Sequence, residues 1–107
     1  MNNRGDLAER MELVGQVFEI DGMQELLTKY EKGISMVKFN AVTIQVTALL
    51  LKHNPDLADK IMVAGTGRTQ EEVDELDDGS YAAVLKDVIL RDVLGFFGSS
   101  PRSDGQK

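Results

Sequence analysis

The sequence predicts an all-α fold, a small helical bundle of about five helices, with a short N-terminal β-hairpin as the alternative for its first part. Three observations support this prediction. Apolar residues recur every three or four positions along most of the chain. Glycine and proline residues separate the periodic segments. A chain of 107 residues is long enough for one core only, so we expect a single helical domain over residues 1–97.

The N-terminal segment is compatible with two structures. One helical face would contain the residues at positions i, i+4, i+7 and i+11, which are Leu7, Met11, Val14 and Phe18. Residues 14–20, however, are rich in strand formers, and Asp21-Gly22 is a turn pair that often joins two strands of a hairpin. We favour the helix. A second helix is predicted over residues 23–32, where Gly33 ends it.

The most apolar stretch of the chain covers residues 39–54. Apolar and polar residues alternate within it, as they do in a strand, but the stretch continues to Leu51 without a turn signal. A length of about 15 residues is unusual for a strand and ordinary for a helix. The helix is expected to end at Asn54, because the residue before a proline avoids the α conformation. We expect this helix to occupy the centre of the domain.

Two short helices and one long helix are predicted for the rest of the chain. The first is capped by Asp56 and runs through Met62 or Val63, and the second begins at a capping box made by Thr69 and Glu72. The long helix runs over residues 80–97. Residues 98–107 are polar and contain no apolar anchor, so we expect a disordered C-terminal tail.

The charge of the protein is concentrated in one segment. The net charge is -6, from 12 Lys+Arg and 18 Asp+Glu. Residues 71–78 alone supply an excess of this size, through the acidic side chains of Glu71, Glu72, Asp74, Glu75, Asp77 and Asp78. The rest of the chain is balanced and has no basic stripe, which argues against nucleic acid as a partner. No apolar run reaches the length of a membrane span, so we expect no membrane partner.

Catalytic and metal-binding patterns are absent from the sequence. The chain contains no cysteine and a single histidine, His53, which has no recognisable nucleophile beside it. The acidic segment lacks two of the ligands that an EF-hand loop requires. We therefore predict a protein that is not an enzyme and has no metal site and no cofactor.

The long C-terminal helix is apolar nearly all round, which indicates burial on most of its sides. Within it, Asp87 and Arg91 are spaced for an ion pair. Because the 39–54 helix is expected to take the centre, one side of the last helix is expected to bind a partner. The predicted partner-binding residues are Leu90, Leu94, Phe96 and Phe97. The alternative is that the two helices pack face to face.

Three segments of the chain carry a resemblance to a known family. These are the mixed-charge segment 26–34, the end of an apolar helix over 49–57, and an acidic segment over 72–76 that leads into a closing apolar helix. Over about two-thirds of its length the chain resembles the tail assembly chaperones of long-tailed bacteriophages. This resemblance carries expectations about function that composition alone does not give.

The resemblance implies a non-enzymatic chaperone that binds helical segments of the phage tape measure protein and keeps that protein soluble during viral tail assembly. It also implies self-association into an oligomer, action in the host cytoplasm, and absence from the mature virion. The alternative function is an acidic helical adaptor or inhibitor that acts through residues 71–78.

Overall fold

The computed structural model describes residues 4–97, and every regular element in this range is helical. In chain order the elements are α1 (Arg4–Phe18), α2 (Met23–Leu27), α3 (Met36–His53), α4 (Pro55–Thr66), α5 (Gln70–Asp74), α6 (Asp78–Val88), the π-helix η1 (Ile89–Val93) and α7 (Leu94–Phe97). The all-α prediction is therefore confirmed. The predicted tail over 98–107 lies outside the described residues.

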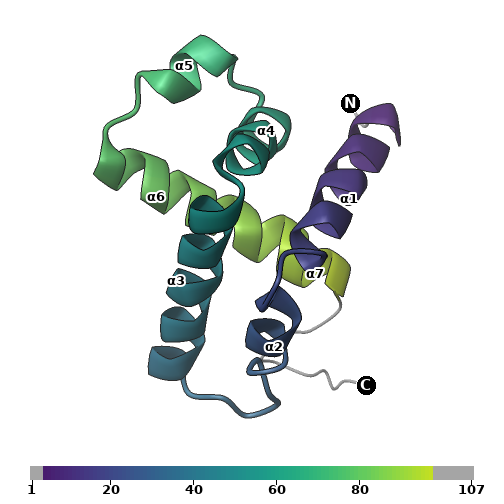
Figure 1. The fold of residues 1–107 in the computed structure, drawn as a ribbon, viewed down its shortest axis with the longest axis vertical. Helices are drawn as coiled ribbons and strands as arrows, with labels where there is room; N and C mark the ends of the chain where they lie inside the picture. Colours follow the sequence, from purple (N-terminus) through teal and green to yellow (C-terminus); the bar gives the residue numbers. More distant parts are fainter. Residues whose placement is uncertain (1–3, 98–107) are drawn as a thin grey trace.

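The segment α6–η1–α7 crosses the middle of the molecule, and the other helices lie around it (Figure 1). On one side α4 packs against α6 and is covered by α1, and α3 contacts both α4 and α6. The side chains of Leu85 and Ile89 are fully buried in this segment. The prediction that the 39–54 helix takes the centre is thus wrong, because the C-terminal segment occupies that place.

The N-terminal alternative of a β-hairpin is not formed. Helix α1 continues to Phe18, and residues 19–22 make a turn. Gly22 has a φ of 87°, a left-handed conformation that glycine adopts at little cost, and α2 begins directly after it. The Asp21-Gly22 pair is therefore a turn between two helices.

The buried face of α1 matches the predicted one only in part, since Val14 is buried and Phe18 packs against the core as predicted. Leu13, Val14 and Val17 point into the core, with exposed fractions of 6% or less. Leu7 and Met11 are 39% and 52% exposed. The face that packs against α4, η1 and α2 is therefore rotated toward Leu13 and Val17.

Two helix starts follow from side-chain caps. The Thr69 hydroxyl accepts a hydrogen bond from the backbone N–H of Glu72 at 3.1 Å, and the Glu72 carboxylate accepts one from the N–H of Thr69 at 2.9 Å, which confirms the predicted capping box. Asn54 caps α4, since its Oδ1 accepts from the N–H of Leu57 at 3.1 Å. The N-cap of α4 is therefore Asn54 and not the predicted Asp56, which lies in the first turn of the helix.

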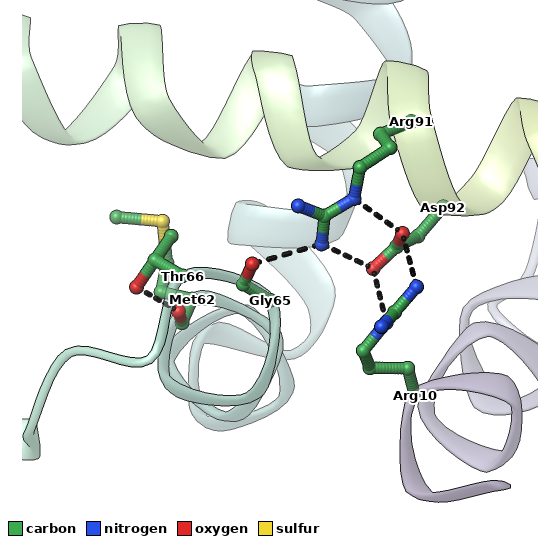
Figure 2. A network of polar contacts seen from close by, with 6 residues as sticks. All are labelled: Arg10, Met62, Gly65, Thr66, Arg91 and Asp92. Carbon is green, nitrogen blue, oxygen red and sulfur yellow. Dashed lines mark hydrogen bonds and ion pairs between the residues drawn. The ribbon is translucent and has the colours of Figure 1, made fainter. Parts of the chain in front are cut away.

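A buried carboxylate connects three parts of the fold (Figure 2). Asp92, only 3% exposed, accepts from Arg91 Nε at 2.8 Å and lies 3.3 Å from Arg10 Nε of α1. Arg91 Nη2 also donates to the carbonyl oxygen of Gly65 in α4 at 2.8 Å. The predicted pair of Arg91 with Asp87 is replaced by these contacts. In η1, which contains Arg91, the N–H of Leu94 bonds to the carbonyl of Ile89, five residues earlier.

Helix α4 and helix α6 approach each other closely at Gly65. A Cβ added at this position would lie 2.7 Å from Val88 Cγ1 and 3.1 Å from Arg91 Nη2. Real Cβ atoms essentially never show a contact as short as the first. Gly65 is therefore required by the packing between the two helices.

Both tyrosines should titrate above the ordinary phenol pKa of 10.0. Burial raises the pKa of Tyr30, and burial together with a hydrogen bond to Asp59 raises the pKa of Tyr81. Since the unfolded chain loses these protons first, the stability they supply is complete below pH 10 and is lost as the pH rises toward the folded pKa values. Phenolate absorbance in an alkaline titration should show no step at the ordinary value while the fold persists; a step there for two phenols would contradict this.

Candidate functional site

The structure places the predicted partner-binding residues in different environments. Leu94 is 6% exposed and belongs to the core, so it is not the surface residue that the sequence predicted. Leu90 is partly buried and packs against the core. The side chains of Phe96 and Phe97 lie outside the described part of the chain. The alternative, in which the C-terminal helix packs on α3, agrees with the contacts of α3 with α6 and η1.

The acidic segment is exposed at all six predicted positions, Glu71, Glu72, Asp74, Glu75, Asp77 and Asp78. Three of these carboxylates make contacts within the protein. Glu72 completes the capping box of α5, Asp74 accepts from Gln70 at 2.9 Å, and Asp77 caps α6 by accepting from the N–H of Ser80 at 2.7 Å. The hydrogen bond from the Ser80 backbone lowers the pKa of Asp77. Two of the six carboxylates, those of Glu72 and Asp77, therefore stabilise the first turns of α5 and α6.

The outward face of α3 is a continuous apolar stripe. Val37 and Ile44 are 80% and 56% exposed, Ala41 and Ala48 are exposed, and Leu51 is partly buried. These five residues are spaced by four, three, four and three positions. That spacing is the a/d pattern by which two helices pack together in a coiled coil. We call these five residues the α3 stripe.

Large and small side chains alternate along the α3 stripe. Val37, Ile44 and Leu51 are separated by Ala41 and Ala48. The alanines leave holes between the larger residues, and a second helix fills such holes with its own side chains. The stripe therefore has the shape of one half of a helix pair whose other half is not supplied by the described part of the chain.

The inner face of α3 fixes the direction in which the stripe points. The Thr43 hydroxyl donates to the carbonyl of Phe39 at 2.9 Å. The Tyr30 hydroxyl lies 2.7 Å from the Thr43 hydroxyl, with which it forms a buried hydrogen bond. The rings of Tyr30 and Phe39 meet edge to face at 5.2 Å. Val46 and Thr47 are also buried. These contacts hold α3 and the 28–35 connection as one unit.

The charges beside the stripe have a single sign. Lys38, Gln45 and Lys52 fall within about 40° of one another around the helix axis, on one flank. On the other flank Asn40 is exposed and neutral, while Thr47 is buried. Helix α3 contains no acidic residue in its 18 residues. The stripe is therefore bordered by positive charge on one side and by an uncharged flank on the other.

A groove of about 580 Å³ lies beside the lysine flank, between α3 and the connection that precedes it. Lys29, Lys32 and Lys38 line it, together with Glu31 and the side of Val42. It adjoins the first turn of α3, which also has no acidic residue and whose free N–H groups carry partial positive charge. Three positive side chains thus gather at one end of the stripe.

The α3 stripe was not predicted, because the local sequence pattern does not show which side of an apolar helix the rest of the protein covers. The 39–54 helix was expected at the centre of the domain, so its apolar residues were expected to be buried, and Val37 lies outside the predicted helix.

His53 is exposed at the end of α3. Among residues 4–97 no group of three or more acidic or histidine side chains is placed to hold a metal ion. In the same range no helix combines the length and the apolar character that crossing a membrane requires.

Comparison of the chain with protein-family models, with curated proteins and with solved structures finds no match.

Proposed function

We propose that this protein is a non-enzymatic helix-binding chaperone of phage tail assembly, which binds helical segments of the tape measure protein through the α3 stripe. The α3 stripe is the observation that carries the proposal. Val37 and Ile44 are exposed on a helix with a/d spacing. This arrangement favours an α-helical partner that covers them with its own apolar face, as amphipathic helices do when they bind an apolar surface. The resemblance over residues 26–97 supports the identity of that partner.

The proposal replaces the predicted binding residues by a different set. Leu94 is held in the core and contributes to binding only by supporting the fold. The protein would act in the host cytoplasm before the tail tube forms and would leave before the virion is complete. Self-association is part of the same proposal, because a long helical partner offers binding sites for several copies in a row.

Ile44→Asp should abolish the chaperone effect and leave the fold intact. Co-expression with the tape measure protein encoded in the same genome measures the fraction of that protein that stays in the supernatant. A charge at the centre of the stripe should weaken binding by about tenfold or more, since it must be buried opposite apolar side chains. Ile44 is 56% exposed in the free protein, so circular dichroism should show an unchanged helix content.

The matched control is Ala82→Asp, which makes the same charge change at an exposed position of α6. It should keep the partner in the supernatant as the wild type does. Equal behaviour of the two variants would contradict the proposal. The acidic adaptor makes the opposite prediction for Glu71→Gln/Glu75→Gln/Asp78→Asn, a variant that leaves the caps at Glu72 and Asp77 intact. We expect this variant to bind normally.

A further inference from the structure

The charges around the α3 stripe select the kind of helix that can bind there. We propose that the partner is a separate amphipathic helix whose apolar seam is bordered, on one side, by acidic residues that face the lysine flank of α3 and the adjoining groove. This inference rests on the proposed function and adds the chemistry of the bound segment to it.

The first argument is the order of charges along α3. Lys38 and Lys52 stand on the same flank, two heptads apart, with Gln45 between them. A partner helix packed on the stripe would place its own flanking residues next to these ammonium groups. Acidic residues at the matching positions would form ion pairs at the rim of the interface, where charge mainly guides association.

The second argument is the groove at the N-terminal end of the stripe. Lys29 and Lys32 lie there with Lys38, against the single acid Glu31. The first turn of α3 adds its partial positive charge, because its only cap is the neutral Ser35 hydroxyl, which accepts from the N–H of Lys38 at 3.2 Å. The acidic side chains of the partner should therefore be densest at the end that lies over this groove.

A second copy of α3 is a poorer occupant. In an antiparallel pair related by a two-fold axis, Lys38 of one copy would face Lys52 of the other, and like charges would meet at both ends. In a parallel pair the lysines would face the neutral flank that contains Asn40, with no charge to compensate them. The charge pattern therefore favours a different chain.

Two designed peptides provide the test. Each has three heptads, about 21 residues, with the same leucine and alanine seam; one carries glutamate on both flanks and the other lysine. Titration calorimetry with the full chain should show that the glutamate peptide binds about tenfold tighter than the lysine peptide. Most of this preference should disappear when NaCl is raised from about 0.05 M to about 0.5 M.

Single substitutions in the protein test which of its residues cause the preference for the glutamate peptide. Lys38→Glu and Lys52→Glu should each reduce it by about threefold or more, because an attraction becomes a repulsion. Lys60→Glu makes the same charge change at an exposed position of α4 and should leave it unchanged. Ile44→Asp should weaken both peptides alike, which identifies the stripe as their common site.

Three results would overturn the inference. Equal binding of the two peptides would refute the acidic preference, and so would a preference that Lys60→Glu reduces as much as Lys38→Glu does. Sedimentation that shows a dimer of the chain alone, dissolved by Ile44→Asp, would identify a second copy as the occupant. The first two results do not decide the proposed function, which is judged separately by the solubility of the tape measure protein with Ile44→Asp and Ala82→Asp. A second copy on the α3 stripe would contradict the proposed binding surface as well.

Discussion

Replacing Asp92 by alanine should lower the free energy of unfolding by about 2–3 kcal/mol. The carboxylate is buried, and two guanidinium groups are oriented around it, that of Arg91 at 2.8 Å and that of Arg10 at 3.3 Å. Loss of one partner of a fully buried pair typically costs about 3–5 kcal/mol. The expected cost is smaller here because the Arg10 and Arg91 side chains are 29% and 52% exposed and water can solvate them.

Urea unfolding followed by circular dichroism would measure this change. Asp87→Ala is the matched control, since Asp87 is exposed on the turn of α6 that precedes η1. Its expected effect is within about 0.5 kcal/mol. A second readout separates the network from simple packing: Arg10→Gln combined with Asp92→Ala should cost less than the sum of the two single changes. Strict additivity would show that the two side chains are not coupled.

Gly65→Ala should destabilise the fold by about 1–3 kcal/mol, although alanine is the better helix former. The added methyl group would lie 2.7 Å from Val88 Cγ1 and 3.1 Å from Arg91 Nη2. Val88 is branched at Cβ and 4% exposed, so it cannot move aside without disturbing the core. Helices α4 and α6 would have to separate, and the hydrogen bond from Arg91 to the Gly65 carbonyl would lengthen with them.

Gly15→Ala is the control for helix propensity. Gly15 lies inside α1, and a Cβ added there meets nothing within 4 Å. This change should stabilise the protein by about 0.5–1 kcal/mol. Thermal unfolding should therefore shift in opposite directions for the two alanine variants. A stabilisation by Gly65→Ala would show that the two helices can move apart at little cost.

Local signals in the sequence were sufficient for most of the helices, although the helix predicted over 23–32 ends at Leu27 and the π-helical turn of η1 was not predicted. The capping box of Thr69 and Glu72 and the boundary at Asn54-Pro55 depend on neighbours within a few residues, and the structure contains both. The choice of helix over hairpin for 14–20 also followed from a local periodicity. In such cases the atoms that decide the conformation are close together in the sequence.

The exposed surface could not be predicted in the same way. The α3 helix and the C-terminal helix are both apolar on more than one side, and only tertiary packing decides which of them is enclosed. The structure encloses Leu94 and leaves Ile44 56% exposed. The burial of Asp92 was equally hidden, because its partner Arg10 is 82 residues away in the chain. Contacts between residues so far apart in the chain produce no periodic pattern in the sequence.

The π-helical turn of η1 has a consequence for how this chain could diverge. A turn closed by a bond between Leu94 and Ile89 holds one residue more than an α-helical turn, so it behaves as a single-residue insertion in an otherwise continuous helix. Deleting one residue there would restore an unbroken α-helix, but would rotate the two sides of the deletion by about 100° relative to each other. We therefore expect that related chains have both the extra residue in this turn and an aspartate between Arg10 and Arg91, or neither.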